Sequence, residues 1–567
     1  MPSARFCVVY SKVSKNFSAD VIQRAMLRDR RKILAFRMKR SPSRALLILT
    51  AISALIHFAA IAFIFERGQP VLFYLLLISE IFHVWLALTY LHTVWGFARR
   101  LRPDPTFRPP VDIYITVAGE PMEVVARTVR AAKALNYPHF RVHILNDGYV
   151  AGKPNWAEAE RLAARLKVNC ITRTVPGGAK AGNINHALSV TPAEYIAVFD
   201  ADHAPLPDFL NKTMDYFADG RMAFVQTPQF YRNRDESYLT AGAWEQQELF
   251  FGPICRGKNR TNSVFMCGTN MVIRKAALRE VGGMAEDNIA EDFVTSLFIH
   301  ERGWKSAYVP EVLAEGLAPE DLFSYYKQQF RWARGSLEIV FRFNPLFRSG
   351  LTWSQRIEYL ASASYHLAGS VVLLNALFPI IFFLTGQVPF DISTMALAAV
   401  FLPYIFLMIY TLQRTSNFGY TFRALALSMS LFPIQLQALW AVLRRKPSVF
   451  AVTSKTKLTG NFLYLALPHL IYFGLVFAGL GIGLGREGLS ASLLNNSAWA
   501  LFNVAVFAPF ALAAIPSFEA HPREEESFKT VAFPPPRYEP SFEPVRKTNF
   551  PQKNITYFRH HEHQDDN

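Results

Sequence analysis

Acidic residues follow apolar runs at several points of this 567-residue sequence, and their spacing suggests metal-ion or acid–base chemistry. Asp200 and Asp202 flank one small residue directly after such a run, and Asp147 follows another. A carboxylate pair of this kind suits Mg²⁺ or Mn²⁺, because these hard cations take oxygen ligands and keep positions open for substrate phosphates. His203 comes next in the chain, and Asp292 belongs to a second acidic pair further on. Such pairs are common on protein surfaces, so the residues around them decide their meaning.

Basic and amide side chains accompany the acidic residues. Lys180 begins the stretch K-A-G-N-I-N, a turn that opens a helix and suits contacts with a phosphate or a ribose. Gln328, Arg331 and Trp332 follow the spacing QxxRW. An arginine at such a site can neutralise an anionic leaving group. The sequence therefore places cations and carboxylates together in the order that a phosphate-binding site needs.

Strands and helices alternate around these residues. Apolar runs at 111–117, 141–145 and 195–199 predict buried strands, and helical spacing at 123–134 and 156–166 predicts helices between them. This alternation predicts a mainly parallel sheet. Ligands of such sheets bind at the carboxyl ends of the strands, which is where both aspartate motifs fall.

The composition adds a membrane part to this soluble block. Hydrophobic residues make up 51% of the chain and charged residues 18%, whereas soluble domains carry about 25% charged residues. Six apolar stretches are long enough to cross a bilayer as helices. They are 45–65, 71–97, 359–385, 394–412, 462–485 and 498–516. A further apolar run, 421–443, contains Arg423 and is followed by Arg444, so we predict an interfacial helix there rather than a span.

The formal charge of +16 agrees with this topology. Basic residues cluster beside the spans, and the positive-inside rule then places the soluble block and both termini in the cytosol. A lipid bilayer explains the charge better than nucleic acid, for which the sequence shows no motif, so no nucleic-acid partner is expected.

Seven regions follow from this division. They are a basic cytosolic segment (1–44), two spans (45–97), a cytosolic domain with the QxxRW helix (98–356), two spans (357–413), a cytosolic interfacial region (414–461), two spans (462–517) and a disordered cytosolic tail (518–567).

The motifs, taken in order, resemble those of the processive family-2 glycosyltransferases, in particular the bacterial cellulose synthases and related β-glucan synthases. The resemblance covers roughly residues 45 to 515. It rests on 111–121, 146–148, 180–185, 199–203, 226–230, 265–269, 290–292, 328–332 and the segment 450–455, which looks like the family's FxVTxK gating loop. The resemblance implies an α/β GT-A-type glycosyltransferase domain inserted in an α-helical polytopic membrane protein.

The resemblance also implies a role for each matching residue. Asp292 would be the catalytic base and Asp202 the direct ligand of Mg²⁺ or Mn²⁺. Gln328 and Trp332 would hold the acceptor, with the indole stacked under the terminal sugar. The nucleotide-sugar would be bound by Asp147, Lys180, Asp200, His203, Arg331, Thr453 and Lys455.

Two positions depart from the family's pattern. Asn146 stands where an acidic residue is usual, and Ala290 stands where threonine is usual, but the neighbouring Asp147 and Asp292 are kept. Many bacterial cellulose synthases also carry a C-terminal PilZ barrel that binds cyclic di-GMP through an RxxxR pair. The arginines after the last span lack that spacing, so intrinsic PilZ control is not expected.

The activity implied is a processive, inverting transfer of glucose from UDP-glucose to a growing β-glucan, coupled to its passage across the bacterial inner membrane. Cellulose, a curdlan-like β-1,3-glucan and a mixed-linkage glucan all remain open. Export through an outer envelope would call for periplasmic or outer-membrane partners. The alternatives are a hyaluronan- or poly-N-acetylglucosamine-type synthase, a non-catalytic assembly or channel subunit, and a non-processive enzyme making lipid-linked sugars.

Overall fold

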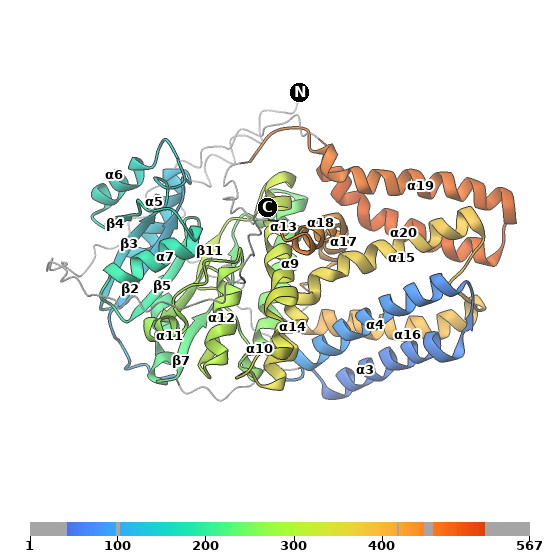
Figure 1. Ribbon diagram of the computed structural model, residues 1–567, viewed down its shortest axis with the longest axis horizontal. Coiled ribbons are helices and arrows are strands. Elements are labelled where there is room, and N and C mark those ends of the chain that lie inside the picture. The colour runs from blue at the N-terminus through green and yellow to red at the C-terminus, as the bar shows by residue number, and fades with distance from the viewer. Residues whose placement is uncertain (1–41, 98–102, 417–418, 447–456, 516–567) are drawn as a thin grey trace, which may run out of the picture.

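The computed structural model describes residues 42–97, 103–416, 419–446 and 457–515. In this part of the chain an α/β domain lies at one end of a bundle of long helices (Figure 1). Most of the basic segment 1–44, the tail 518–567, Thr453 and Lys455 lie outside the described residues. The expectations made for them stay predictions.

A seven-stranded mixed sheet forms the centre of the α/β domain, with the strand order β10-β7-β9-β5-β2-β3-β4. All neighbours pair in parallel except β9, which is antiparallel to both β5 and β7. The strands are β2 (Val111–Val117), β3 (Phe140–Asn146), β4 (Asn169–Thr172), β5 (Tyr195–Asp200), β7 (Met222–Gln226), β9 (Met271–Arg274) and β10 (Lys305–Tyr308). The mainly parallel sheet predicted from the sequence is therefore confirmed.

Both faces of the sheet are covered by helices, which explains why the strands are apolar runs. Every residue of β2 is buried. Ile113 packs in the core beneath α5 and α6, whereas the neighbouring Tyr114 packs in the core beneath α7 and α11. The helices of the domain are α5 (Met122–Lys133), α6 (Ala157–Leu166), α7 (Ala179–Val190), α8 (Phe209–Met214), α9 (Tyr238–Leu249), α10 (Cys255–Thr261), α11 (Lys275–Val281), α12 (Glu291–Glu301) and α13 (Leu322–Glu338).

A second, three-stranded sheet adjoins the carboxyl end of β5. Its strand order is β6-β11-β8. The strands are β6 (Ala204–Pro205), β8 (Phe230–Tyr231) and β11 (Ala314–Gly316). Because β6 begins four residues after Asp200, this small sheet fixes the chain that leaves the DxD motif.

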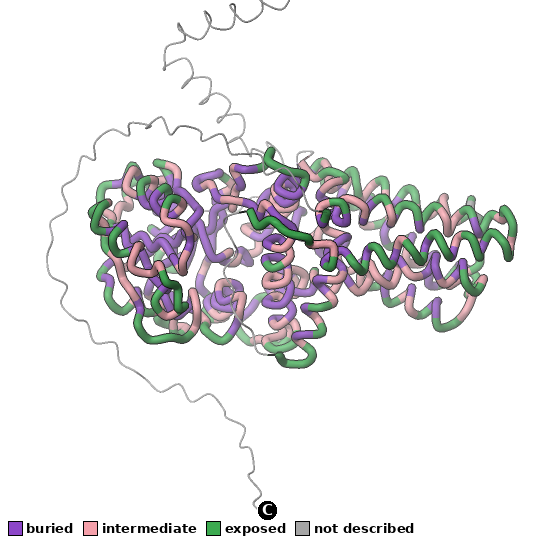
Figure 2. Tube along the Cα trace, turned by 90° about the horizontal axis from the view of Figure 1, so that it is seen from above, coloured by how far each residue is buried: buried purple, intermediate pink, exposed green. Residues whose placement is uncertain are grey.

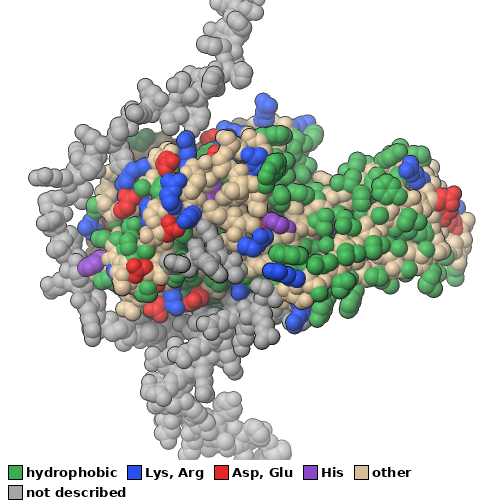
Figure 3. Space-filling model, turned by 90° about the horizontal axis from the view of Figure 1, so that it is seen from below, with side chains coloured by type: hydrophobic (Ala, Val, Ile, Leu, Met, Phe, Trp, Pro, Cys, Tyr) green, Lys and Arg blue, Asp and Glu red, His purple; other side chains and the backbone are tan. Residues whose placement is uncertain are grey.

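Seven helical segments among the described residues are long and apolar enough to cross a membrane. They include all six stretches predicted as spans, and the seventh is Phe422–Leu443. Hydrophobic side chains gather on the face of the bundle shown in Figure 3. Many residues of the bundle are exposed, in contrast to the buried interior of the domain (Figure 2). An apolar outer surface of this extent is what a helix bundle in lipid presents. The helices are α3 (Arg44–Ala59, continued by η1, Ala60–Ile64), α4 (Pro70–Thr93), α14 (Trp353–Ser364), α15 (Ala368–Thr385), α16 (Thr394–Thr415), α19 (Leu463–Glu487) and α20 (Ala491–Ala513).

The short links between these helices meet at the end of the bundle far from the domain (Figure 1). The link after η1 forms β1 (Glu66–Arg67), which pairs with β12 (Phe390–Asp391) between α15 and α16. Arg486 in the last turn of α19 donates to the carbonyls of Phe382 and Phe383 in α15. The links between the two helices of each of these pairs therefore share one end of the bundle.

The segment predicted to be interfacial consists of two helices, α17 (Phe422–Ser430) and α18 (Phe432–Leu443). Thr421 bonds to Glu245 of α9, and the carbonyl of Lys446 accepts a hydrogen bond from Arg334 of α13. Both ends of the pair thus contact the domain, and the pair lies where the bundle meets the domain (Figure 1). A helix pair lying in the membrane interface would need such contacts with the domain. The segment is, however, also long and apolar enough to be a span. The topology relative to a membrane stays a prediction.

Candidate active site

A cavity of about 720 Å³ opens at the carboxyl edge of the large sheet. It is lined by every predicted site residue that the structure describes, from β5, the loops after β3 and β5, and the helices α7, α12 and α13. These residues are Asp147, Lys180, Asp200, Asp202, His203, Asp292, Gln328, Arg331 and Trp332. The antiparallel β9 joins this edge through its amino end, which brings Gly268 into the same cavity. The structure thus brings together motifs up to 185 residues apart, as Asp147 and Trp332 are.

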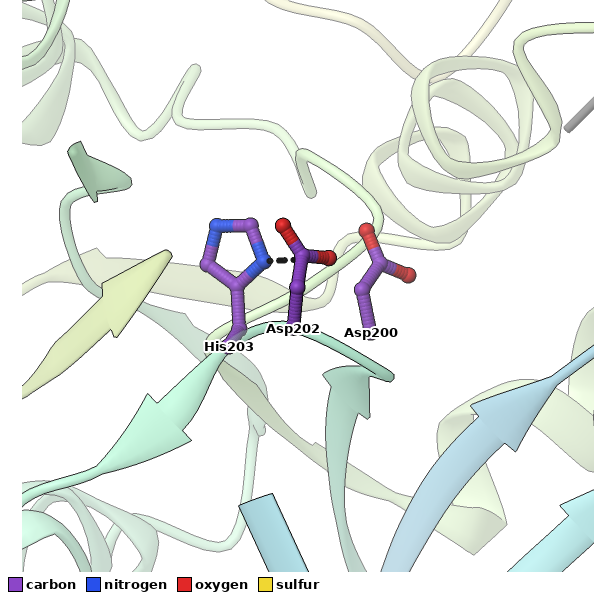
Figure 4. A group of neighbouring side chains, drawn as sticks. All are labelled: Asp200, Asp202 and His203. Atoms are coloured by element: carbon purple, nitrogen blue, oxygen red, sulfur yellow. Dashed lines mark ion pairs between the residues drawn. The ribbon is translucent and has the colours of Figure 1, made fainter. Parts of the chain in front are cut away.

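Asp200, Asp202 and His203 form a group that could hold a metal ion. Their ligand atoms all lie within 4.8 Å of one another. The three side chains point to the same side above the strand ends (Figure 4), and His203 Nδ1 lies 3.5 Å from Asp202 Oδ1. Two carboxylates with one imidazole fit Mg²⁺ or Mn²⁺ by donor type.

The position of His203 depends on a glycine. A Cβ atom at Gly316 in β11 would lie 2.3 Å from His203 Nε2, so any side chain there would displace the imidazole. The backbone N–H of Leu317, the next residue, donates to Asp202 Oδ2 at 3.2 Å. The small sheet therefore holds both Asp202 and His203 in place.

Lys180 connects the two acidic motifs. Its ammonium forms an ion pair with Asp200 and donates to the carbonyl of Gly268 at 2.8 Å. Burial lowers the pKa of Lys180, but Asp200, Glu291 and Asp292 outweigh burial and raise it above the ordinary value. The amine is therefore a permanent cation in the cavity, suited to an anionic diphosphate.

Asp147 has a partner that the sequence analysis missed. Arg173 Nε and Nη2 donate to the two Asp147 oxygens at 2.8 and 2.9 Å, and the same guanidinium donates to the carbonyls of Gly177 and Ala179. One arginine thus orients the carboxylate and shapes the loop that leads to Lys180. Arg173 directly follows β4, so the rule that parallel strands carry ligands at their carboxyl ends could have identified it.

Asp292 lies in the first turn of α12 and faces Gly268. A Cβ atom at Gly268, whose φ is +79°, would lie 3.2 Å from Asp292 Oδ2, so this glycine permits the close approach. Burial and the neighbouring Glu291 raise the pKa of Asp292 to about 7. A carboxylate in a cleft whose pKa lies near neutral pH is suited to general-base catalysis.

An aromatic stack supports Asp292 from behind. Phe293 stacks on Phe265 with 4.1 Å between ring centroids and on Tyr359 with 5.6 Å. The Tyr359 hydroxyl bonds to His300 Nδ1 at 2.7 Å. Because Tyr359 belongs to α14, the first part of a candidate span, the stack joins the base to the helix bundle.

A buried ion pair next to this stack reinforces the junction. Lys258 of α10 donates to the carboxylate of Glu358 at 3.1 Å and to its carbonyl at 2.9 Å. Thr93 at the end of α4 donates to both Glu358 oxygens at 3.0 Å. The domain, α14 and the first pair of long helices therefore meet at one carboxylate.

Two glutamines hold the loop that carries Cys267 and Gly268. Gln226 Oε1 accepts from the Cys267 N–H at 2.8 Å, and Gln229 Nε2 donates to the Cys267 carbonyl at 2.7 Å. These contacts give the segment 226–230, Q-T-P-Q-F, a positioning role.

The QxxRW residues lie on one face of α13, because positions i, i+3 and i+4 align on a helix. Gln328 is buried and Trp332 is half-buried at the cavity. The Tyr231 hydroxyl, which also lines the cavity, bonds to Gln328. This face supplies one wall of the site.

The described residues next to the FxVTxK segment are attached to the same helix. Asp321, the N-cap of α13, accepts from the Ser324 N–H at 2.8 Å and from the Leu458 N–H at 3.1 Å. At the other end Arg334 donates to the carbonyl of Lys446 and pairs with Glu338 at 3.2 Å. Thus α13 connects the site to both chain positions that border this segment.

Two family models match the chain. "Glycosyltransferase like family 2" matches residues 109–335, and "Cellulose synthase" matches residues 278–418. Together with the mixed sheet and the apolar helices, these matches confirm the α/β GT-A-type domain within an α-helical bundle.

Characterised relatives agree with the family models. The chain is 32% identical over 437 residues to a cellulose synthase catalytic subunit [UDP-forming] of Pseudomonas fluorescens, covering 74% of this chain and 58% of the relative. It is 33% identical over 473 residues to cellulose synthase 1 of Komagataeibacter xylinus, covering 79% of this chain and 30% of the relative. The chain thus spans between 30% and 58% of these relatives' length.

A solved mannosyltransferase from Pyrobaculum calidifontis, in complex with GDP-Man and Mn²⁺, is similar with a TM-score of 0.44 and 17% identity, covering 71% of this chain and 99% of that one. The family models and the identities, rather than this distant likeness, decide the assignment. The chain carries a family-2 glycosyltransferase domain and is similar to the bacterial cellulose synthases.

Proposed function

We propose that the protein is a processive, inverting β-glycosyltransferase that polymerises glucose from UDP-glucose and passes the glucan through its own helix bundle. The observation that carries this proposal is the single cavity that joins the DxD group, Asp292 and the QxxRW face. The relatives' printed name, cellulose synthase catalytic subunit [UDP-forming], supports UDP as the released nucleotide and glucan as the product.

In the proposed reaction an acceptor hydroxyl of the growing chain attacks the anomeric carbon of the donor. Asp292 takes the proton from this hydroxyl, and the bond to UDP breaks on the opposite face of the sugar. Inversion needs no covalent intermediate, so a single base is sufficient. The acceptor sugar would stack on Trp332, with Gln328 beside it.

Basic side chains would stabilise the departing diphosphate. Lys180 and Arg331 line the same cavity as the acidic motifs, and His203 lies next to Asp202. Asp147, fixed by Arg173, would bind the nucleoside. A divalent cation at Asp202, with Asp200 and His203 close by, would neutralise charge on the leaving group. Thr453 and Lys455 would cap the nucleotide.

The surrounding helices suggest why synthesis and membrane passage would be coupled. The helix α13 packs on α18 through Phe330, Ala333 and Leu337, on the helix face opposite the acceptor residues, at the end of the bundle where the domain joins it. The acceptor site would therefore lie one helix away from the bundle that the product enters. We propose placement in the bacterial inner membrane, with the catalytic domain and both termini cytosolic and with any export partners on the other side.

The test is synthesis by the purified full-length chain in nanodiscs. Radiolabelled UDP-glucose, UDP-N-acetylglucosamine and UDP-glucuronate are supplied with Mg²⁺ or Mn²⁺, and the product is digested with hydrolases specific for β-1,4 or β-1,3 links. We expect a long polymer from UDP-glucose alone. A polymer that needs an N-acetylated donor would favour the hyaluronan or poly-N-acetylglucosamine alternative, and a lipid bearing one sugar would refute processivity.

A further inference from the structure

Four ionisable side chains meet inside the helix bundle, far from the active site. His57 comes from α3, Glu80 and His83 from α4, and Tyr404 from α16, all within candidate spans. His57 Nε2 lies 3.4 Å and His83 Nδ1 lies 3.7 Å from the same oxygen, Glu80 Oε2. The Tyr404 hydroxyl bonds to His83 Nε2 at 3.0 Å. The carboxylate is thus held between two imidazoles.

Glu80 is the only acidic residue in α3, α4, α15, α16 and α20. It is only 8% exposed. A lone carboxylate on a lipid-facing helix is costly, and ionisable residues in such positions mark ion or proton sites more often than structural ones. Its burial between two histidines therefore calls for a functional account.

No other charged group faces this cluster from the packed helices. Neither α15, which packs on α4, nor α20, which packs on α16, contains a titratable side chain. The helix α14 also packs on α4 and carries Arg356, Glu358 and Tyr359, but it meets α4 at the domain end, where Glu358 bonds to Thr93. The remaining titratable residues of α3, α4 and α16 lie elsewhere along these helices. They are Arg44, Tyr74, Tyr90, His92, Tyr410 and Arg414. The charge of the cluster is therefore set by its own protons.

The two histidines differ in access. The His57 side chain is 3% exposed, whereas the His83 side chain is 39% exposed. His57 Nδ1 has no hydrogen-bond partner among the residues that the structure describes. Glu80 thus lies between an enclosed imidazole with a vacant nitrogen and an imidazole that reaches the helix surface. This geometry allows a proton to enter at His83 and to reach His57.

The same residues hold three helices together. The His57 ring stacks on Tyr404 with centroids 5.1 Å apart, which joins α3 to α16. Nearer the domain the hydroxyls of Thr50 and Thr411 bond at 2.9 Å across the same pair of helices. The cluster therefore lies at the contact of α3 and α4 with α16.

We propose that His57, Glu80 and His83 form a proton-binding site inside the bundle, and that its proton controls how tightly α3 and α4 pack on α16. With one proton on an imidazole, the carboxylate is paired and the cluster is neutral. Loss of that proton to water leaves one buried negative charge, and a second proton leaves one positive charge. Either change places an uncompensated charge among apolar helices and loosens the contact.

The threonine pair provides a reporter that needs no catalytic activity. With Thr50→Cys and Thr411→Cys in the full chain in nanodiscs, the rate of disulfide formation under a fixed oxidant measures the approach of α3 to α16. Thiolate formation also depends on pH. Each rate of disulfide formation measured between pH 5 and 9 is therefore divided by the rate, at the same pH, of the same cysteine pair combined with Glu80→Gln. Single-cysteine variants measure the background from the native thiols.

We expect the ratio to fall on the alkaline side by up to about tenfold per pH unit, the limit for one linked proton. The double variant His57→Gln/His83→Gln, which keeps the carboxylate but cannot hold the proton on an imidazole, should crosslink slowly across the whole range. His469→Gln is the matched control, since this buried imidazole bonds to the Ser430 carbonyl rather than to a carboxylate, and it should leave the pH profile unchanged.

A ratio that is flat with pH would overturn the proposal, as would rapid crosslinking in the double-histidine variant. If Glu80→Gln does not fold, Glu80→Asp replaces it and should shift the profile rather than abolish it. Polymer synthesis is not measured here, so the result stands apart from the proposed glucan synthase activity.

Discussion

The pH dependence of synthesis offers the sharpest check on Asp292. This carboxylate must be ionised to accept a proton from the acceptor hydroxyl. Burial and the neighbouring Glu291 raise its pKa to about 7, so activity should be lost as the pH falls through that value. At one pH unit below the pKa about a tenth of the carboxylate is ionised, and kcat/KM should fall to about a tenth of its plateau.

Removing the charge of Glu291 should move the acid limb of the pH–rate profile, which is the range in which kcat/KM falls as the pH falls. In Glu291→Gln the repulsion that raises the Asp292 pKa is lost, so the acid limb should shift to lower pH. The shift, rather than the absolute rate, is the quantity that tests the reasoning. Asp287→Asn is the matched control, because Asp287 pairs with Arg342 at the exposed surface and should leave the limb in place.

The assay is the initial rate of UDP release at subsaturating donor, followed from pH 5.5 to 9 in nanodiscs. An acid limb that stays at the same pH in Glu291→Gln would refute the coupling of the two carboxylates. Polymer synthesis by Asp292→Asn at more than about a hundredth of the parent rate would remove Asp292 as the base, since a general base contributes about 10²–10⁴-fold.

Substitutions at four further positions test the rest of the site. Asp202→Ala should abolish Mn²⁺ binding measured by calorimetry and reduce synthesis below detection; undiminished Mn²⁺ binding would remove Asp202 as a ligand. Gly316→Ala places a Cβ 2.3 Å from His203 Nε2 and should weaken Mn²⁺ binding by about 10–100-fold, as loss of a supporting contact does; unchanged affinity would show that His203 contributes nothing to the cation. Arg173→Lys keeps the charge but loses the bidentate contact with Asp147. Because a hydrogen bond to a charged group is worth about 1.5–3 kcal/mol, the donor KM should rise about tenfold or more with kcat little changed. An unchanged KM would contradict the positioning role of Arg173. Tyr359→Ala should lower the free energy of unfolding in denaturant by about 3–5 kcal/mol and should also lower kcat. Tyr359→Phe keeps the ring on Phe293 and should retain kcat. Equal losses of kcat in both variants would show that the stack does not support the base.

The parts of the fold that are buried on both sides could be predicted from sequence. The strand predicted at 111–117 is β2 with identical bounds, because helices cover both its faces and five of its seven residues are apolar. The aspartates that follow β3 and β5 were placed correctly by the rule that parallel strands carry ligands at their carboxyl ends. The predicted residues share a cavity for that reason.

Contacts that join distant segments could not be predicted in the same way. The strand before Arg173, β4, is exposed or half-buried throughout, so N-C-I-T gave no apolar signal. The fit of His203 against Gly316 joins residues more than a hundred positions apart, and no local pattern reports it. The break at Leu431 that divides 421–443 into α17 and α18 likewise lies within one apolar run. Strand pairing and the packing of side chains from distant segments determine these features.

The chain positions on both sides of the FxVTxK segment are attached to α13. These attachments constrain the length of that helix. Asp321 and Arg334 are thirteen positions apart, with Gln328, Arg331 and Trp332 between them. One residue inserted into this stretch would advance everything after it by about 1.5 Å and turn it by about 100°. Either the indole or the Lys446 contact would then leave its position. Homologous enzymes should therefore vary in the loops around this helix far more readily than in its number of residues.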